Sequence, residues 1–342
     1  MSRRSFTLAL STALMLVMAL VSAGPAQAAS SKAKEKAERT RIVKYWNPKR
    51  MANATPRDFV KKNGKFVPAK RGGNKPDKPG GGGDDGGDVA ESTSVVTGAS
   101  WTSGGAALNA TGKVFFTMGS SNYVCSGAAV DDQSRSGYSL VLTAGHCLFD
   151  ESTGNFATNW MFAPAYDTNP NGCSVAPHGC FTAVALVVHD GYASSGGFNS
   201  QAIKHDWGFA VVGAGSKGGQ LDGKVAEFPI AFNAANVVRT SFGYPASGKY
   251  DGRDLVFCSG PVITDRNYDT WGLECDMTPG SSGGPWMRGF SMSSKSGTLN
   301  SVNSYKYNGG PNRKYMFGPK FGTKTQKTYD AALKALKNTE VN

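Results

Sequence analysis

Two short segments that lie far apart in the sequence carry the residue types needed for acyl transfer. Residues 142–147 are Leu-Thr-Ala-Gly-His-Cys, and residues 278–285 are Thr-Pro-Gly-Ser-Ser-Gly-Gly-Pro. A serine hydroxyl is a weak nucleophile at neutral pH, so it needs a base within hydrogen-bonding reach. We therefore predict that Ser282 is a nucleophile and that His146 is its general base.

A base of this kind needs a third group that fixes its tautomer, and Asp206 is the candidate. Asp206 precedes the apolar run 209–212, which places the carboxylate at the edge of a buried strand. Without the other two segments, an ordinary strand-end carboxylate would be the simpler interpretation. Asp167, Asp190 and Asp222 lie in polar, turn-like sequence, where we expect solvated carboxylates.

The glycines around Ser282 indicate a tight turn. Gly280, Gly283 and Gly284 allow the backbone to turn sharply and let a substrate approach closely. The backbone N–H groups of Gly280 and Ser282 can then point to one place, where they would form an oxyanion hole. On its own, this segment would be an ordinary loop about as often, because short motifs recur by chance.

Taken jointly, the three segments resemble the trypsin and chymotrypsin superfamily of serine endopeptidases over residues 95–340. The pairing of Thr-Ala-Gly-His-Cys with Gly-x-Ser-Gly-Gly-Pro, in that order, is far more specific than either half. The chain is most similar to the bacterial secreted branch that includes the glutamyl endopeptidases, and residues 45–51 resemble pro-segments of such relatives. The resemblance implies a double β-barrel, a Ser-His-Asp triad and no cofactor.

Two positions depart from the trypsin pattern. Ser281 stands where animal trypsins have the aspartate that pairs with the new N-terminal ammonium after activation. Asp276 lies six residues before Ser282, as does the specificity carboxylate of trypsins, but Met277 and Thr278 follow it and the trypsin loop pattern is missing. Because Ser281 replaces that aspartate, we do not expect the N-terminal activation switch of trypsins here.

These residues leave the preference at the cleaved bond open. Asn303 stands where glutamyl endopeptidases carry a substrate-reading histidine, which weakens a glutamate preference. Asp276 is compatible with an arginine or lysine preference, and equally with an ordinary loop role. Segment Ser304 to Lys306 is expected to pair with an extended substrate as an added strand. Asp276, Asn303 and Ser304 are thus the candidate substrate-binding residues.

Short β-rich runs separated by Gly, Asn, Asp and Ser clusters fill the chain from about residue 92. Such a pattern is typical of antiparallel barrels or a sandwich, and the length is enough for two barrels with a cleft between them. We expect an all-β, chymotrypsin-like fold of two antiparallel six-stranded β-barrels, at about residues 100–215 and 216–325. A C-terminal α-helix is predicted over 328–338, with Thr328 as its cap.

Residues 1–28 match a secretory signal peptide, with a basic start, an apolar run over 8–21 and a small-residue cleavage site at 26–28. The apolar run is too short for a membrane anchor, so we expect a secreted, extracellular chain without stable membrane insertion. Residues 29–91 are predicted to be a basic pro-segment that includes a flexible Gly-rich linker over 64–88. The peptidase domain is expected over 92–342.

The net charge of +12 belongs mostly to the N-terminal part of the chain. Residues 1–91 contain 18 Lys and Arg against 8 Asp and Glu, whereas residues 92–342 contain 19 against 17. A nucleic-acid-binding protein would need a basic patch on its folded part. Composition gives no sign of one, so we expect no nucleic-acid partner.

All six cysteines follow the signal peptide, and an even number in an exported chain favours disulfides. Many pairings are open, and we predict the three that join sequence neighbours and close small loops, Cys125–Cys147, Cys173–Cys180 and Cys258–Cys275. The first would fix the backbone beside His146, and the last would brace the loop that leads to Ser282. Because no Cys-x-x-Cys occurs, we expect no metal site.

These observations together predict a monomeric serine endopeptidase that is made as a zymogen and cleaves polypeptides through an acyl-enzyme. Two alternatives remain: an esterase with the same triad, and a binding module on a catalytically inactive protease scaffold. The double-barrel interpretation argues against the esterase. Inactive scaffolds usually lose a triad residue, and here all three are present.

Overall fold

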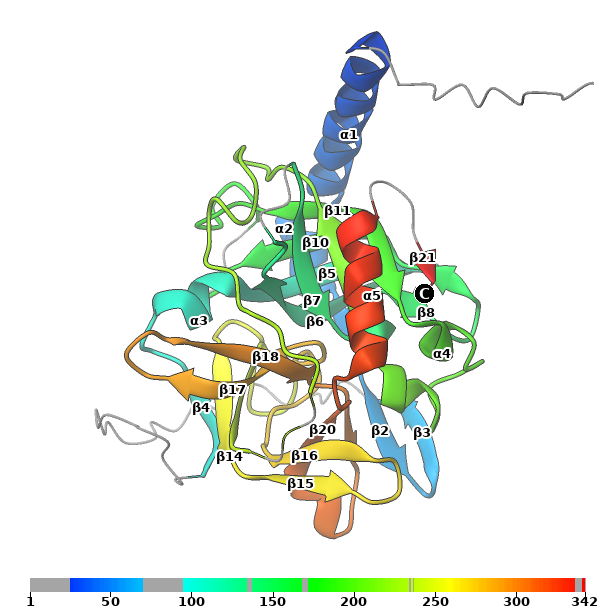
Figure 1. The fold of residues 1–342 in the computed structure, drawn as a ribbon, viewed down its shortest axis with the longest axis vertical. Helices are drawn as coiled ribbons and strands as arrows, with labels where there is room; N and C mark the ends of the chain where they lie inside the picture. Colours follow the sequence, from blue (N-terminus) through cyan, green and yellow to red (C-terminus); the bar gives the residue numbers. More distant parts are fainter. Residues whose placement is uncertain are drawn as a thin grey trace, which may run out of the picture.

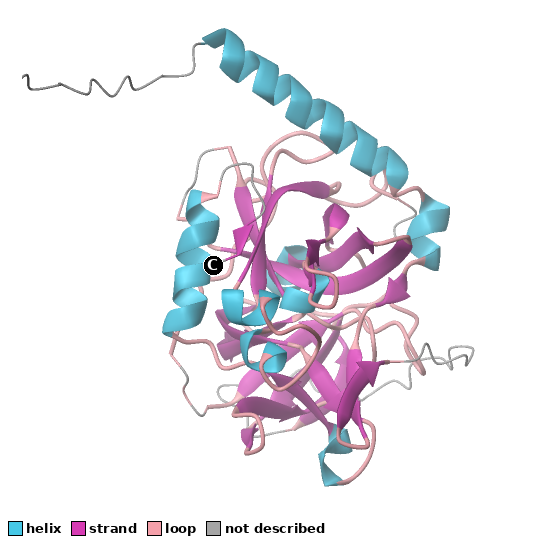
Figure 2. Ribbon diagram, turned by 90° about the vertical axis from the view of Figure 1, so that its right-hand side faces the viewer, coloured by secondary structure: helices cyan, strands magenta, loops and turns pink. Residues whose placement is uncertain are grey.

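The computed structural model describes residues 25–69, 95–133, 137–167, 172–233, 235, 237–335 and 340–341. Within them the architecture is mostly β, with the strands gathered in two groups (Figures 1 and 2). Helices α1 (Pro25–Tyr45) and α5 (Thr323–Lys334) both contact strands of the first group. No helix of these described residues is both long and apolar enough to cross a membrane.

The first group of strands is a closed antiparallel barrel. Its order is β6-β5-β10-β11-β12-β7, and β7 pairs back onto β6. Because β6 and β7 pair with each other, neither end of this strand order is left as a free sheet edge. The strands are β5 (Thr111–Met118), β6 (Ser121–Val130), β7 (Ser139–Thr143), β10 (Thr158–Pro164), β11 (Phe181–Val188) and β12 (Gly208–Val212).

The second group contains two sheets that share two bent strands. Strand β14 (Val256–Gly260) is followed by β15 (Val262–Asp265), and β18 (Ser296–Val302) is followed by β19 (Tyr305–Tyr307). If each pair is counted as one strand, six strands close into a ring in the order β13, β14/β15, β16, β20, β19/β18 and β17. The predicted pair of six-stranded barrels is thereby confirmed. The other strands are β13 (Arg239–Gly243), β16 (Thr270–Glu274), β17 (Pro285–Ser291), β20 (Tyr315–Gly318) and β4 (Val96–Ser100), which pairs with β14.

The chain before residue 70 folds onto both barrels. It contains α1, α2 (Pro48–Asn53), β1 (Thr55–Pro56), β2 (Phe59–Lys62) and β3 (Lys65–Pro68). Strand β1 pairs in parallel with β6 of the first barrel, and β2 pairs in parallel with β19 of the second. Figure 1 shows β2 and β3 in blue beside the second barrel.

The linker predicted over 64–88 does not begin at residue 64. Residues 65–68 form β3, which pairs with β2 in an antiparallel hairpin. The turn residues Asn63 and Gly64 have φ of 49° and 76°. This is the left-handed backbone that Asn-Gly turns favour between two strands. Residues 70–88 of the predicted linker, and residues 1–24 of the predicted signal peptide, lie outside the described part of the chain.

The C-terminal helix begins earlier than predicted. Helix α5 starts at Thr323, so Thr328 lies inside it rather than at its cap. The Thr328 hydroxyl donates to the backbone oxygen of Lys324 at 3.0 Å and accepts from the Trp207 indole at 3.3 Å. A threonine in a helix can satisfy its hydroxyl in this way, so its presence does not mark a helix start. Residues 336–338 of the predicted helix lie outside the described residues.

The remaining elements are short; all but β21, which pairs with β11, lie in connections between longer elements. They are α3 (Gly105–Ala110), α4 (Asp190–Ala193), β8 (Phe149–Asp150), β9 (Asn155–Phe156), β21 (Glu340–Val341) and the 3-10 turns Gly145–Cys147, Ala202–His205 and Pro311–Lys314.

Candidate active site

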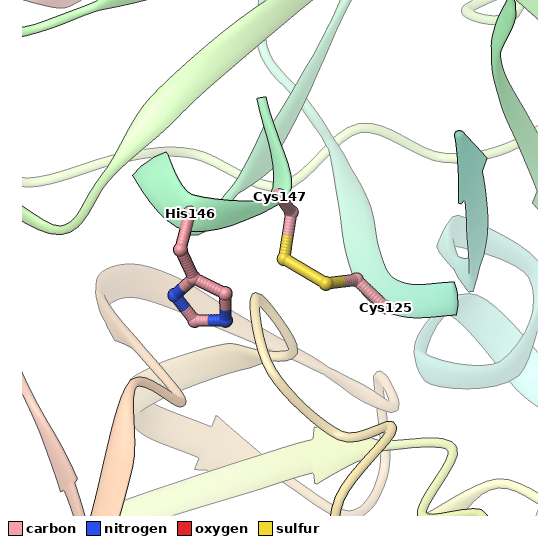
Figure 3. Close-up of side chains that lie close together, drawn as sticks. All are labelled: Cys125, His146 and Cys147. Atoms are coloured by element: carbon pink, nitrogen blue, oxygen red, sulfur yellow. A yellow bond between two sulfur atoms is a disulfide. The ribbon is translucent and has the colours of Figure 1, made fainter. Parts of the chain in front are cut away.

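His146 is held in the short turn Gly145–Cys147, directly after β7. Its side chain is fully buried. The neighbouring Cys147 forms the predicted disulfide with Cys125 of β6, as Figure 3 shows. Strand β7 on one side and the disulfide on the other therefore fix the backbone of His146.

Asp206 lies against His146 because β12, which begins at Gly208, pairs with β7 in a register that places Gly208 opposite Thr143. One Asp206 carboxylate oxygen accepts the His146 backbone N–H at 2.9 Å, and the other lies 2.8 Å from His146 Nδ1. Neither side chain is exposed. A carboxylate only accepts hydrogen bonds, so it holds the proton on Nδ1 and leaves Nε2 as the basic nitrogen.

Ser304 is brought to the same carboxylate from the second barrel. Its hydroxyl donates to Asp206 Oδ2 at 2.5 Å, and its backbone N–H donates to Phe317 of β20 at 2.9 Å. The sequence singles out Ser304 as a substrate-binding residue. In the structure its side chain is buried and oriented toward Asp206 instead.

Ser282 lies in the predicted tight turn. Gly280 and Gly283 have φ of 107° and 79°, values that favour glycine. A Cβ atom on Gly283 would collide with the Thr143 hydroxyl and the Ser126 carbonyl. The turn is tied to β6, because the Ser282 carbonyl accepts the Ser126 N–H at 2.7 Å. These contacts place Ser282 beside the end of β7, the strand that precedes His146.

The hydroxyl of Ser282 is hydrogen-bonded to Asp58, a residue that the sequence did not single out. Ser282 Oγ donates to Asp58 Oδ1 at 2.7 Å, and the Gly280 N–H donates to Asp58 Oδ2 at 2.8 Å. Nε2 of His146 is buried and has no hydrogen-bond partner among the described residues. Burial raises the pKa of Asp58, although His146 and the bonds from Ser282 and Gly280 oppose that rise.

The other two predicted substrate-binding residues have partners within the protein. Asp276 pairs with Lys249 at 2.5 Å, accepts the Tyr250 hydroxyl at 2.6 Å, and keeps 42% of its side chain exposed. Asp276 also borders a hollow of about 500 Å³ together with Lys306. Asp276 therefore forms a surface ion pair on the second barrel.

Asn303 is fully buried behind the turn that carries Ser282. Its oxygen accepts from the Ser241 hydroxyl at 2.9 Å and from the Trp286 indole at 2.6 Å. Its nitrogen donates to the Ser281 carbonyl at 3.0 Å. These bonds brace the turn from inside the barrel, so the side chain of Asn303 is occupied by the protein itself.

The other two predicted disulfides, Cys173–Cys180 and Cys258–Cys275, are also present. Two groups of potential metal ligands occur among the described residues. In the first, around His146, both cysteine sulfurs are already joined to each other. The second is Asp131, Asp132 and Glu227. Burial and the neighbouring Asp132 raise the pKa of Glu227 to about 8, which opposes a fully charged carboxylate cluster at neutral pH.

Comparisons with known proteins find serine proteases. The family model of the lysyl endopeptidase C-terminal domain matches residues 94–180. The structure of the protease Anisep from Arthrobacter nicotinovorans is 40% identical, with a TM-score of 0.59, and the match covers 70% of this chain and 100% of that one. A thermostable serine protease, AL20, from an extremophilic microorganism is 35% identical with a TM-score of 0.58, over 68% of this chain and 100% of its own.

A Glu endopeptidase structure shares the fold at 18% identity, with a TM-score of 0.52, over 70% of this chain and 97% of its own. No curated protein sequence matches the chain. The two more similar proteases are matched over their full lengths, at identities high enough to establish common ancestry. Their match and the double barrel agree with the resemblance found in the sequence. The chain belongs to the bacterial branch of the chymotrypsin-like serine proteases.

Proposed function

We propose that this chain is the precursor of a secreted serine endopeptidase that cleaves polypeptides with Ser282, His146 and Asp206. The observation that carries the proposal is the buried His146–Asp206 pair, bonded at 2.8 Å, beside a turn that directs the Ser282 hydroxyl and the Gly280 N–H at one carboxylate. A base, its orienting acid and a nucleophile thus lie near one carboxyl group, that of Asp58.

The reaction follows from these roles. Asp206 holds the proton on Nδ1, so Nε2 of His146 can take the Ser282 proton as Oγ attacks the substrate carbonyl. The C=O electron pair moves to oxygen, and the N–H groups of Gly280 and Ser282 stabilise that oxyanion. His146 then gives the proton to the leaving amine, which leaves an acyl group on Ser282. Water, deprotonated by His146, hydrolyses this ester and restores the serine.

The contacts of Asp58 support the assignment of the oxyanion hole. The Gly280 N–H donates to its carboxylate, and a backbone hydrogen bond at Ser282 helps to lower the pKa of Asp58. Two backbone donors therefore converge on one carboxyl group. A peptide carbonyl that gains negative charge during attack would make the same demand on them.

The edge of β19 favours a peptide rather than a small ester as substrate. Strand β19 already accepts an added strand, β2, through backbone pairing of Tyr305–Tyr307 with Phe59–Lys61. An extended polypeptide can use the same backbone groups, whereas a simple ester offers none. This edge contains Tyr305 and Lys306 of the Ser304 to Lys306 segment that the sequence predicts for substrate pairing.

We assign residues 1–28 to a signal peptide, 29–91 to a pro-segment and 92–342 to the peptidase domain. The family match begins at residue 94, close to this last boundary. Three disulfides fit an extracellular location, where thiols are oxidised. The chain would then be exported before its pro-segment is removed.

Replacement of Ser282 tests the proposal. Ser282→Ala should lower kcat for peptide cleavage by ~10⁴-fold or more, because triad removal typically has this effect. Ser281→Ala is the matched control, since its hydroxyl donates to the Thr278 carbonyl at 3.0 Å and not into the site. Full activity of Ser282→Ala would refute the proposal. Cleavage of esters without cleavage of peptides would favour the esterase, and no turnover by the processed wild type would favour the binding module.

A further inference from the structure

The N-terminal segment enters the proposed active site with a side chain rather than a peptide bond. Asp58 is only 8% exposed, and its two oxygens accept from Ser282 Oγ and from the Gly280 N–H. A carboxylate is a poor electrophile, because its negative charge opposes attack by an alcohol. The segment can therefore occupy the site of the reacting carbonyl without being acylated onto Ser282.

The contact also separates the nucleophile from its base. A serine hydroxyl has one proton, and in this structure Ser282 donates it to Asp58. His146 Nε2, the atom that should receive that proton, has no partner among the described groups. The nucleophile is thus paired with an acceptor that cannot pass its proton on to a leaving amine.

Neighbouring residues hold Asp58 in place. On one side, Arg57 donates to the His146 carbonyl at 2.6 Å and to the buried carboxylate of Glu151 at 3.2 Å. On the other side, the ring of Phe59 stacks on Phe198 with centroids 3.9 Å apart and meets the edge of His146 at 5.6 Å. A charged pair and an aromatic pair therefore fix the backbone on both sides of Asp58.

The hairpin β2–β3 fills the remaining substrate edge. Phe59, Val60 and Lys61 pair with Tyr305, Lys306 and Tyr307 in a parallel register. In β3, the ring of Phe66 meets Tyr305 at 5.3 Å and Phe198 at 5.5 Å. The strand position proposed for the substrate is thus occupied along the whole of β19.

We propose that residues 55–68 are a built-in inhibitor of this protease, with the Asp58 carboxylate as the group that occupies the oxyanion hole and holds Ser282 away from His146. The proposal rests on the function proposed above. It has a consequence for activation. Cutting the chain between residues 69 and 95 breaks one connection but none of these contacts, so the segment should stay bound until it is displaced or degraded.

The test measures how fast the uncut precursor reacts with a fluorophosphonate, in which the serine oxygen replaces fluoride on phosphorus. Asp58→Ala should speed this labelling about ten-fold or more, because hydrogen bonds to a charged group are being removed. Asp58→Asn, which keeps the shape, is the second variant. Glu38→Ala is the matched control, since Glu38 pairs with Arg41 on exposed α1. It should label as slowly as the wild-type precursor.

The processed wild-type enzyme, separated from the cleaved N-terminal segment before the measurement, distinguishes the two possible failures. If it labels rapidly while both Asp58 variants label as slowly as the wild-type precursor, the inhibitor proposal is wrong and the proposed function stands. If the wild-type precursor labels as fast as the processed enzyme, the inhibitor proposal is also wrong. If no form labels at Ser282, the proposed function fails and the inhibitor proposal falls with it.

An added peptide tests the same contact without altering the folding of the chain. A synthetic peptide of residues 54–69 should slow labelling of the processed enzyme. The same peptide with Asp58→Ala should require an about ten-fold higher concentration to reach the same inhibition. Equal potency of the two peptides would overturn the role of Asp58.

Discussion

Asp206 receives donors from both barrels. His146 follows β7 of the first barrel, and Ser304 precedes β19 of the second. Both side chains donate to Oδ2 of the same buried carboxylate. The geometry of the proposed triad therefore depends on how the two barrels meet, and we propose that Ser304 positions Asp206 at that junction.

Removing the Ser304 hydroxyl should slow the reaction while leaving substrate affinity nearly unchanged. Ser304→Ala takes one hydrogen bond from a buried charge, a loss of about 1.5–3 kcal/mol, which corresponds to about ten-fold or more in kcat. The matched control is Ser301→Ala, another buried serine, which donates to the Pro319 carbonyl at 2.7 Å. Steady-state kinetics would contradict this role if KM rose and kcat stayed constant.

The sequence alone suggests His146, Asp206 and Ser282 as the triad, because each lies in a local pattern that constrains its own backbone, and their catalytic roles stay a prediction. The sequence could not reveal that Ser304 contacts Asp206, because the two residues are 98 positions apart and come together only where the barrels join. Nor could it identify Asp58, which is 224 residues from Ser282. Asp58 stands in a basic segment without a catalytic motif, so only the assembled fold reveals its contact.

Among the elements, the hairpin β2–β3 has a local turn signal in its sequence, although we predicted a linker from residue 64 onward. Asn63-Gly64 lies between the runs 59–62 and 65–68, each with apolar residues, and this dipeptide is a strong signal for a two-residue turn. The high content of Gly, Pro and Lys after residue 64 favoured a linker over a hairpin. A turn signal next to a low-complexity segment can therefore mark a hairpin, as it does here for β2 and β3.

The connection between the barrels contains a carboxyl group whose protonation should affect stability. Burial, followed by Asp132, Asp222 and Asp131, raises the pKa of Glu227 to about 8. Between its ordinary pKa and about 8, the folded protein binds more protons at Glu227 than the unfolded chain does. The contribution of this group to stability should therefore fall as the pH rises through that window.

Glu227→Gln should remove that dependence. In an inactive Ser282→Ala background, which prevents self-digestion, the variant should gain thermal stability relative to its parent more at pH 8 than at pH 5. Glu274→Gln is the control, because Glu274 forms a surface ion pair with Lys314. An equal effect of Glu227→Gln at both pH values would show that the protonation of Glu227 is not coupled to folding.

At the scale of the whole molecule, a basic N-terminal part packs against two nearly neutral barrels of the same chain. Strand β4 begins at Val96 and pairs with β14, and the Thr97 carbonyl accepts the Asp276 N–H at 2.7 Å. The second barrel therefore includes the chain from about residue 96 onward, because β4 pairs with β14. If the proposed pro-segment is removed, we expect the cut to fall before this strand.

Mature forms that begin at any residue from 88 to 95 should be about equally active. Ser281 offers no carboxylate to pair with a new N-terminal ammonium, so the exact cleavage point should matter little. Forms that begin at 101 lack β4 and should be less stable. To test this, precursors with a specific cleavage site at successive positions are cut, separated from the N-terminal segment, sequenced from the new N-terminus and compared in rate. A sharp optimum at one terminal residue would reveal an N-terminal switch with a partner other than Ser281.

The central claim is that Ser282 is the nucleophile and that His146 activates it. The most direct measurement is fluorophosphonate labelling of the processed enzyme, with the modified residue located by mass spectrometry. We predict one modified residue, Ser282, and slower labelling by ~10³-fold or more in His146→Ala, because the hydroxyl then lacks its base. Modification of Ser281 or another serine, or unchanged labelling of His146→Ala, would contradict the account.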